Sequence, residues 1–557
     1  MVFTFISILI ITLVCYSWGD LFFGKGIFAR SAVLAHPAII SLAGLMMVSM
    51  TATILSLFVP LGPLWIKSLF LLPLLWLIYR KGIPALVNPF RTLFTGFSMG
   101  AWILFSALLL MALVLSAPAI IHPDTLGYHA PVIKWIETYK AVPGIVHLQP
   151  RMGLQNTWFV SIALFDLFPV RGNGLVFLPV AVLSWYFLFL TDHINRSFLQ
   201  KDLSSLLGWL AWLGISLFPI TLVRLTAAST HPDFMAVLVC WVIFWLLSKR
   251  KGENELAVHS LIILFGFYAL TIKWSVLPIM VLALYSFTRL SYRSVPKTLY
   301  VSCIALLLLG GTLARNTISS GYPFFPTDSM DWINVDWKPP KKELLDMQDY
   351  VTGYARGYKE GSAQEAINGS NARFEEWIPV WWKHLTLPDK IMILLTLLAL
   401  LISVIRLQSK IFREEYGRLW LVSFTGLLFW WLIAPDPRFG YAFITGLILA
   451  AFSGKIPLPD KKWIGGKISF LFLLPAILIT LYTGYRGWKD QVYQHLLLPA
   501  GPFMKNTGQV IEIEGRKLYK PLDQEGCSWN ALPCTPDDMK EVEYRGNIME
   551  DGFRRKF

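Results

Sequence analysis

Long apolar segments alternate with short polar segments along most of this chain. Segments such as 39–59 and 101–116 reach or approach the roughly 20 apolar residues that a helix needs to cross a hydrocarbon core of about 30 Å. Because these runs are continuous and do not alternate with polar residues, they predict helices and not the strands of a barrel. Clusters of Lys and Arg lie between them, and placing all the clusters in the cytoplasm gives the chain one orientation.

This pattern predicts an all-α polytopic membrane protein with about fourteen transmembrane helices. The predicted spans are residues 2–18, 38–59, 62–79, 98–117, 175–192, 203–220, 232–248, 257–272, 274–290, 297–314, 389–405, 418–434, 439–453 and 468–485. The apolar segment 156–170 does not fit as a further span, because it would move the basic residues 249–251 to the outer side. We therefore expect it to be a juxtamembrane helix along the outer face, paired with the amphipathic segment 132–140.

The orientation divides the chain into three parts, which are N-terminal transmembrane helices (1–97), a transmembrane core (98–485) with outer loops at 118–174 and 315–389, and an extracytoplasmic C-terminal cap (486–557). Within the cap, segments 511–515 and 517–521 have the composition of strands. Cys527 and Cys534 flank six residues there. An oxidising outer compartment favours a disulfide between them, with a zinc-binding pair as the rival interpretation.

Composition agrees with a membrane protein and limits the choice of partners. Of 557 residues, 55% are hydrophobic and 15% are charged, which exceeds the apolar content that a soluble core needs. The formal charge of +14 could indicate nucleic acid, but the Lys and Arg residues lie in short clusters beside the spans. The positive-inside rule explains this distribution better, so we expect membrane lipids and no nucleic acid as partners.

Candidate chemistry is concentrated in the first outer loop, immediately after a predicted span. Its polar residues include His122, Asp124, Tyr128, His129 and Lys134. A carboxylate at the edge of a membrane has a high desolvation cost, so its presence indicates a functional site. Because burial beside lipid disfavours a charged carboxylate, we expect a raised pKa for Asp124, which would improve it as a general base. The simpler alternative is a solvated polar loop.

The sequence His-Pro-Asp occurs a second time, at His231 to Asp233, on the next outer segment. Asp233 could converge with Asp124 on one cavity and orient an acceptor or a metal. Pro followed by Asp is also common where a helix begins, so a helix N-terminus is the alternative interpretation.

Several cations are expected near the outer ends of helices, where a planar guanidinium can bind phosphate oxygens with two hydrogen bonds. The candidates are Arg224, Arg315 and Arg438, the last in the turn Pro435–Arg438 together with Asp436. Lys273 lies at another outer helix end. Snorkelling of these side chains to lipid headgroups is the alternative interpretation.

An acid directly after a span, two juxtamembrane helices in the first outer loop and a long later outer loop together resemble the GT-C class of integral-membrane glycosyltransferases. The runs HPDTLGYHAPVIKWIETYKAVPG, RNTISSGYPFFP, DPRFGY and CSWNALPCTP also resemble a family of bacterial polytopic membrane proteins. The resemblance covers about residues 98–557.

The resemblance implies a GT-C-like fold in the bacterial inner membrane, with the active site and the C-terminus on the periplasmic side. It implies an inverting transferase that moves a sugar from a polyprenyl-phosphate-linked donor to a glycan, lipid or protein acceptor. Asp124 takes the place of the catalytic base, and Asp233 that of the second acid. Because Asp124 is a single acid where the class has an adjacent acidic pair, the use of a divalent metal stays open. His122, His129 and His231 could replace a carboxylate as ligands.

Two other classes of function compete with the transferase. A secondary transporter or lipid flippase for an anionic lipid-linked substrate would show charges inside the spans and broken helices in matching halves. A non-catalytic anchoring protein of an envelope complex would tolerate replacement of Asp124.

Overall fold

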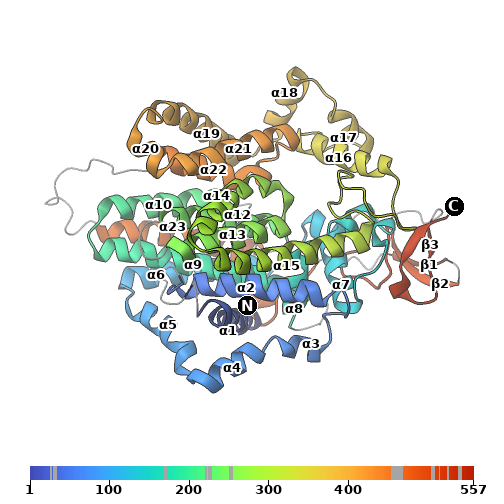
Figure 1. Cartoon of the computed structure of the whole chain (residues 1–557), viewed down its shortest axis with the longest axis horizontal. Coiled ribbons are helices and arrows are strands. Elements are labelled where there is room, and N and C mark those ends of the chain that lie inside the picture. The colour runs from blue at the N-terminus through green and yellow to red at the C-terminus, as the bar shows by residue number, and fades with distance from the viewer. Residues whose placement is uncertain are drawn as a thin grey trace.

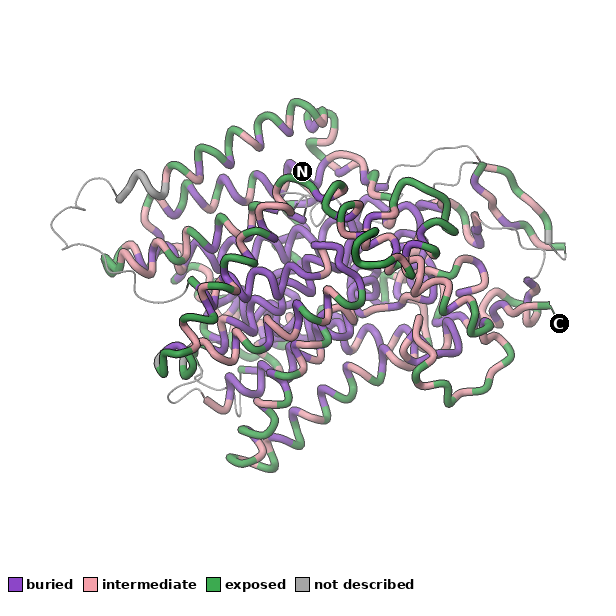
Figure 2. The backbone as a smooth tube through the Cα atoms, turned by 90° about the horizontal axis from the view of Figure 1, so that it is seen from above, coloured by how far each residue is buried: buried purple, intermediate pink, exposed green. Residues whose placement is uncertain are grey.

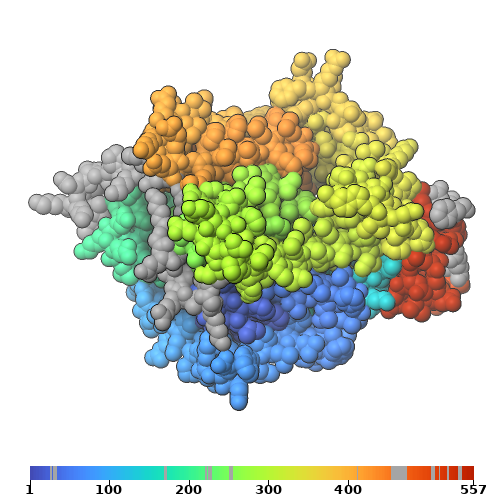
Figure 3. All heavy atoms as spheres, viewed as in Figure 1, coloured from blue at the N-terminus to red at the C-terminus, as the bar shows by residue number. Residues whose placement is uncertain are grey.

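The computed structural model describes the chain except for residues 25–27, 29–33, 168–171, 220–221, 224–228, 250–254, 453–467, 503–507, 514, 523–525, 537–541 and 557. Its long helices run roughly parallel to one another in a layered body (Figure 1). The helices in the middle of this body are buried, and exposed positions gather at its periphery (Figure 2). In the space-filling view, the N-terminal helices form one outer layer and the helices between residues 387 and 452 lie on the opposite side (Figure 3).

The α-helices are α1 Val2–Phe23, α2 Pro37–Leu55, α3 Leu64–Leu69, α4 Leu72–Lys81, α5 Pro84–Thr95, α6 Met99–Ser116, α7 Ala130–Thr138, α8 Thr157–Phe165, α9 Phe177–Leu199, α10 Leu203–Leu217, α12 Pro232–Ser248, α13 Glu255–Ile272, α14 Met280–Arg293, α15 Val295–Ser320, α16 Lys341–Ala355, α17 Ala363–Gly369, α18 Phe374–His384, α19 Leu387–Arg406, α20 Lys410–Glu415, α21 Gly417–Ile433, α22 Pro437–Phe452 and α23 Ile468–Lys489. Short helical turns of other types are η2 Thr125–His129, η3 Ile145–His147, η4 Pro150–Gly153, η5 Asn173–Val176, η6 Trp274–Ile279, η8 Val492–His495 and η9 Met549–Asp551.

Among the described residues, eight helices are long and apolar enough to cross a membrane, and four shorter apolar helices accompany them. Each predicted span coincides with helical structure, which supports the general prediction of a helical multi-pass membrane protein. The helices pack closely where small residues allow it. A Cβ atom on Gly44 of α2 would lie 1.7 Å from the Cys15 carbonyl oxygen of α1, so only glycine permits this backbone contact.

The predicted span at 62–79 is helical with one short interruption, and a sharp bend follows its end. The segment is divided into α3 and α4, and the chain then bends by 89° into α5. Proline begins both α4 and α5, and Gly82 between them has a φ of 75°. Proline at a first helical turn and glycine in the left-handed region are both typical of a helix boundary, which explains the break.

The prediction of two paired helices in the first outer loop is confirmed, but their position differs from the expected one. Helices α7 and α8 pack together, and every residue of α8 is buried. The Ser161 hydroxyl of α8 lies 2.7 Å from that of Ser49 in α2, and the Thr157 hydroxyl lies 3.1 Å from that of Thr271 in α13. Helix α8 is therefore part of the helical body and does not lie along its surface, because its apolar side chains are enclosed on all sides.

The segments predicted to be on the outer side gather at one end of the body, on the right in Figure 1. There the backbone N–H of Ile120 donates to the Gly501 carbonyl at 2.8 Å, and that of Gly144 donates to the Ile318 carbonyl at 3.1 Å. The long loop 315–389 contains the three helices α16, α17 and α18. The predicted grouping of these segments on one side therefore holds within the described part of the chain.

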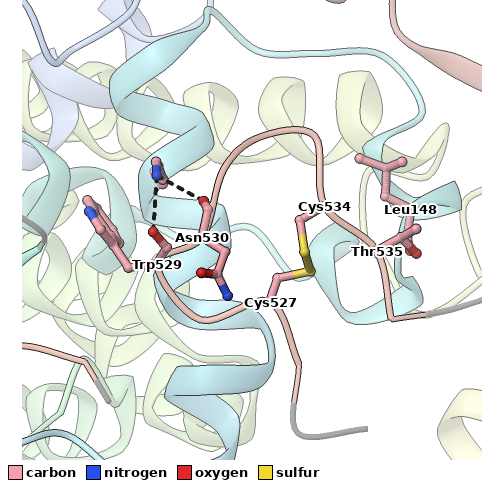
Figure 4. The surroundings of a disulfide bond; sticks show 7 residues. Leu148, Cys527, Trp529, Asn530, Cys534 and Thr535 are labelled. Carbon is pink, nitrogen blue, oxygen red and sulfur yellow. Dashed lines mark hydrogen bonds between the residues drawn. A yellow bond between two sulfur atoms is a disulfide. The ribbon is translucent and has the colours of Figure 1, made fainter. Parts of the chain in front are cut away.

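The C-terminal cap contains two antiparallel pairs of strands and the predicted disulfide. Strands β1 Gly508–Ile513 and β2 Arg516–Pro521 form one pair, and β3 Val542–Tyr544 and β4 Phe553–Arg555 form the other. Cys527 and Cys534 are joined in a turn that faces the first outer loop (Figure 4). The disulfide interpretation is thus confirmed over the zinc pair.

Candidate functional site

Five segments that are distant in the sequence meet at one end of the helical body. They are the turn before η2 at Asp124, the η4 turn at Arg151, the N-terminus of α12 at His231, the junction of α13 and η6 at Lys273, and the first turn of α22 at Arg438. Each of these residues lies at or near the end of a helix or helical turn, and these ends are on the same side of the body. Their side chains form one connected cluster, which we call the Asp124 cluster.

Asp124 precedes an unusual helical turn. Residues Thr125–His129 form a π-helix, and the N–H of Ala130 donates to the Thr125 carbonyl. Pro131 follows and has no N–H to donate to the Gly127 carbonyl, which favours a local departure from the regular helix. Single π-turns within helices are frequent at functional sites because they redirect the side chains around them.

The carboxylate of Asp124 lies among cationic and imidazole groups. Its Oδ2 is 3.3 Å from Nη1 of Arg438 and 3.5 Å from Nε2 of His231, and its Oδ1 is 3.7 Å from Nη1 of Arg151. The same Nη1 of Arg438 is 3.3 Å from Nε2 of His231. The Asp124 side chain is 22% exposed, so the carboxylate is reachable from outside while most of it is enclosed.

Asp233, which we predicted as the second acidic residue of the site, contacts the side of the His231 ring that faces away from Asp124. Nδ1 of His231 lies 3.1 Å from Oδ2 of Asp233, and the other carboxylate oxygen forms an ion pair with Lys273. The prediction that Asp124 and Asp233 converge is therefore met through the imidazole of His231, which lies between the two carboxylates. The alternative interpretation as a helix start also applies, because His231 is the N-cap of α12 and Pro232 is in its first turn.

Two more histidines and a tyrosine line the same space. The ring centre of His231 is 5.0 Å from that of His122 and 5.2 Å from that of His129, and the rings of Tyr128 and His129 are 4.3 Å apart. His129 is fully buried, and neither of its ring nitrogens has a hydrogen-bond partner among the described residues. Such buried polar atoms without partners are rare in folded proteins and need an explanation.

The prediction of a raised pKa for Asp124 is wrong. Burial does raise it, but the hydrogen bond from His231 and the positive charge of Arg438 outweigh burial, so the pKa of Asp124 lies well below its usual value. Burial lowers the pKa of His231 to about 3 and also lowers the pKa of His122 and of His129. The resting cluster therefore contains a charged carboxylate and neutral imidazoles at physiological pH.

Asp436 and Arg438 form the wall opposite His231. The backbone N–H of Arg438 donates to Oδ1 of Asp436 at 3.2 Å, and Lys359 of the long loop lies 3.0 Å from Oδ2. Burial alone would raise the pKa of Asp436, but the charges of Arg438 and Lys359 lower it. The guanidinium of Arg438 also lies 5.9 Å from the ring centre of Tyr354 in α16. The long outer loop thus covers this side of the cluster.

Lys359 and Tyr354 were missed by sequence reasoning. They lie among many charged and aromatic residues of the long loop, and nothing in their spacing distinguishes them from their neighbours. Only the contacts of α16 and of the segment that follows it with the Pro435–Arg438 turn identify them. Such aromatic and cationic residues can be identified as part of a site only from their contacts in the folded protein, because their local sequence does not distinguish them.

Three of the predicted substrate-binding residues are not part of the Asp124 cluster as described. The ammonium of Lys134 donates to the carbonyls of Trp529 and Asn530 in the cap, at 3.1 and 2.9 Å (Figure 4). The guanidinium of Arg315 is buried and donates to Oε1 of Gln155 at 2.9 Å and to the hydroxyl of Ser56 at 2.8 Å. Arg224 lies outside the described residues.

The cluster includes residues that could hold a metal ion. His122, Asp124 and His231 each offer one ligand atom, and these atoms lie within 4.8 Å of one another. Two imidazoles and a carboxylate are a common ligand set for transition metals in proteins.

The fold and the cluster define the chain as a helical protein of the multi-pass membrane type, with ionisable groups gathered at one end of its helices. The chain belongs to the family described as Domain of unknown function (DUF8201), whose model matches residues 1–445. No curated protein and no solved structure matches the chain.

Proposed function

We propose that this protein is a membrane glycosyltransferase of the GT-C type, which moves a sugar from a polyprenyl-phosphate-linked donor to a hydroxyl group of a glycan, lipid or protein acceptor. One observation carries the proposal. The carboxylate of Asp124 contacts the guanidinium of Arg438 at 3.3 Å, at the end of a bundle of membrane-type helices. A base beside a phosphate-binding cation is the pair of groups that transfer from a lipid phosphate requires.

The charge of the cluster suits a donor with a single negative charge. Arg438, Arg151, Lys273 and Lys359 contribute four positive charges, and three carboxylates, those of Asp124, Asp233 and Asp436, contribute three negative charges. One positive charge therefore remains for the phosphodiester of a lipid-linked sugar. The planar fork of Arg438 can bind two of its oxygens, and the apolar helices below provide a lipid-compatible path for the polyprenyl tail.

The chemical step would follow from these positions. The acceptor hydroxyl gives its proton to Asp124 as its oxygen forms a bond to the anomeric carbon, and the bond from that carbon to the phosphate oxygen breaks. Attack from the face opposite the phosphate inverts the configuration, through a transition state with positive charge on the sugar ring. The bonding electrons leave with the lipid phosphate, whose growing negative charge Arg438 stabilises more than that of the bound donor.

The low pKa of Asp124 in the resting cluster is compatible with this role. A donor phosphate bound to Arg438 would neutralise the charge that holds the pKa of Asp124 low. The pKa would then rise, and Asp124 would become a stronger base when the donor is in place. Binding of the donor and activation of the base would thus be coupled through one guanidinium. The orientation given by the positive-inside rule puts this site on the periplasmic side of the bacterial inner membrane.

The test is transfer of a radiolabelled sugar from extracted polyprenyl-phosphate donors to endogenous acceptors by the purified full chain in lipid nanodiscs. We expect Asp124→Asn to lower the rate by about 10²–10⁴-fold, the usual contribution of a general base. Asp346→Asn, which changes a half-buried carboxylate on α16, is the matched control and should keep the wild-type rate. All three proteins must elute as one species of the same size.

An unchanged rate in Asp124→Asn would exclude Asp124 as the base. If the wild type transfers no sugar from any donor but moves labelled lipid-linked substrate across proteoliposome membranes, the transporter alternative is correct. Transporters often contain broken helices, and the bend between α4 and α5 is of this kind. This bend is the reason to include the transport measurement in the experiment.

A further inference from the structure

We propose that His122, Asp124 and His231 form a binding site for one divalent transition-metal ion, of which zinc is the first candidate. One donor atom from each residue lies within 4.8 Å of the others. Two imidazole nitrogens and one carboxylate oxygen favour zinc and its neighbours over Mg²⁺ or Ca²⁺, which prefer oxygen ligands alone. The statement about binding stands by itself, and only the role of the ion rests on the proposed function.

The distances within the cluster agree with ligands around a common ion. Two ligand atoms about 2.1 Å from a tetrahedral ion lie about 3.4 Å apart. Oδ2 of Asp124 and Nε2 of His231 are 3.5 Å apart. Two imidazoles bound to such an ion have ring centres about 5 Å apart, given the same metal–nitrogen distance. The ring centres of His122 and His231 are 5.0 Å apart.

A carboxylate behind His231 sets the orientation that a metal ligand needs. Nδ1 of His231 lies 3.1 Å from Oδ2 of Asp233, and in the resting structure it accepts a hydrogen bond from the Asp233 backbone N–H at 3.4 Å. When an ion binds, the proton of the neutral ring would move from Nε2 to Nδ1, where Oδ2 of Asp233 can accept a hydrogen bond from it. The lone pair of Nε2 then points toward Asp124. Metal-binding histidines usually donate a hydrogen bond from the N–H of their second ring nitrogen to a carboxylate, a carbonyl or a water molecule, which fixes the tautomer and strengthens the ligand.

Buried nitrogens without partners give an independent indication of a missing ligand. Nδ1 of His122 and both ring nitrogens of His129 are buried and have no hydrogen-bond partner among the described residues. The ring centre of His129 is 5.2 Å from that of His231, so His129 lines the space beside the proposed ligands. A bound ion with its water ligands would satisfy these atoms, whereas a site for apolar ligands would not.

Arg438 competes with the ion for the same atoms. Its Nη1 lies 3.3 Å from both Oδ2 of Asp124 and Nε2 of His231. A metal ion at those atoms would repel the guanidinium, which would turn toward Asp436, whose Oδ1 lies 3.7 Å from its Nε. The ion and Arg438 are therefore alternative cations at Asp124. In the proposed transferase the bound ion would act as a Lewis acid on the donor phosphate.

The experiment measures metal content and affinity of the full chain, purified in detergent without a polyhistidine tag. The protein is stripped with a chelator, incubated with Zn²⁺, Mn²⁺, Co²⁺ or anaerobic Fe²⁺, desalted and analysed by mass spectrometry of the metal. Affinity is then measured by competition with a chromophoric chelator. The variants are His122→Ala, His231→Ala, Asp233→Asn and Arg438→Gln. His147→Gln is the matched control, because His147 lies on the same loop and its Nε2 contacts the Trp337 carbonyl.

We expect one ion per chain in the wild type and in His147→Gln, and loss of the ion in His122→Ala and His231→Ala. Asp233→Asn should retain the ion with about 10–100-fold lower affinity, as expected for a residue behind a ligand. Arg438→Gln should bind the ion more tightly than the wild type, because the competing cation is gone. This last variant keeps all three ligands, so it tests the site even if the histidine variants fold poorly.

Wild-type protein that retains none of the four ions would overturn the proposal, as would full metal content in the double variant His122→Ala/His231→Ala. Weaker binding in Arg438→Gln would exclude the competition between the two cations and with it the assigned ion position. Metal content is measured without any sugar donor. A site that binds its ion in a protein that transfers no sugar would therefore refute the proposed function and leave the metal site standing.

Discussion

The contact between Arg438 and Asp124 leads to a specific prediction about pH. The positive charge of Arg438 is one of the causes that hold the pKa of Asp124 well below its usual value. A carboxyl group with a lowered pKa stays charged until the pH falls below that lowered value. In the proposed transferase, kcat/KM decreases as Asp124 becomes protonated, so the wild-type profile should stay flat far into the acid range. Removing the charge in Arg438→Gln should move this decrease to higher pH.

The size of the shift can be estimated from the geometry. Nη1 of Arg438 and Oδ2 of Asp124 are 3.3 Å apart, and both side chains are about one-fifth exposed. Two unit charges at this distance interact by about 5 kcal/mol at an effective dielectric constant of about 20. This equals about 3.7 pKa units and is an upper value. Because Arg151 and His231 remain beside Asp124 in the variant, we expect a shift of about 1–3 units.

The assay is sugar transfer at low donor concentration between about pH 4 and pH 9, with each profile scaled to its own plateau. Arg438→Gln will also have a lower plateau, but only the position of the acid decrease is compared. Arg438→Lys keeps the charge and should decrease at nearly the wild-type pH. Lys359→Gln is the control, because Lys359 pairs with Asp436 and not with Asp124. If the decrease stays in place in Arg438→Gln, then Arg438 does not set the charge state of the base, or the base is another group.

Three further predictions concern other parts of the molecule. Lys134→Met removes the two hydrogen bonds that the ammonium donates to cap carbonyls, each worth about 1.5–3 kcal/mol, and should make the cap more sensitive to limited proteolysis. Cys527→Ser with Cys534→Ser should lower the urea concentration at which the cap becomes cleavable, because closing so short a loop stabilises by about 2–3 kcal/mol. Arg315→Met leaves buried oxygen atoms without a hydrogen-bond donor, so the free energy of unfolding should fall by about 1–3 kcal/mol per atom. A thermal melt should show this loss of stability, while KM for the donor should stay unchanged.

Local chemistry explains why some of these features could be predicted from the sequence. Apolar runs predict helices wherever they occur, because a backbone in lipid must satisfy its own hydrogen bonds. His-Pro-Asp at 231–233 predicts a helix start, and the structure has His231 as the N-cap of α12. The pairing of Cys527 and Cys534 could also be predicted from the sequence, because few residues separate the two cysteines.

The break after α4 and the burial of α8 could not be predicted from local sequence. An apolar segment such as 156–170 has the same composition whether lipid or other helices surround it. The structure encloses α8 on all sides, with its Ser161 hydroxyl 2.7 Å from that of Ser49. The identity of its neighbours depends on the positions of helices far away in the chain.

The sequence by itself determined that this is a helical protein of the membrane type, that its polar outer segments share one side, and that Asp124 and His231 are candidates for chemistry. Only the tertiary structure decided the electrostatic state of Asp124. A single buried carboxylate beside lipid would have a raised pKa, but Arg438 approaches from a turn 314 residues away and reverses the direction of the shift. Hydrophobic patterning and helix starts depend on near neighbours in the chain, whereas the charge of a buried group depends on its neighbours in space.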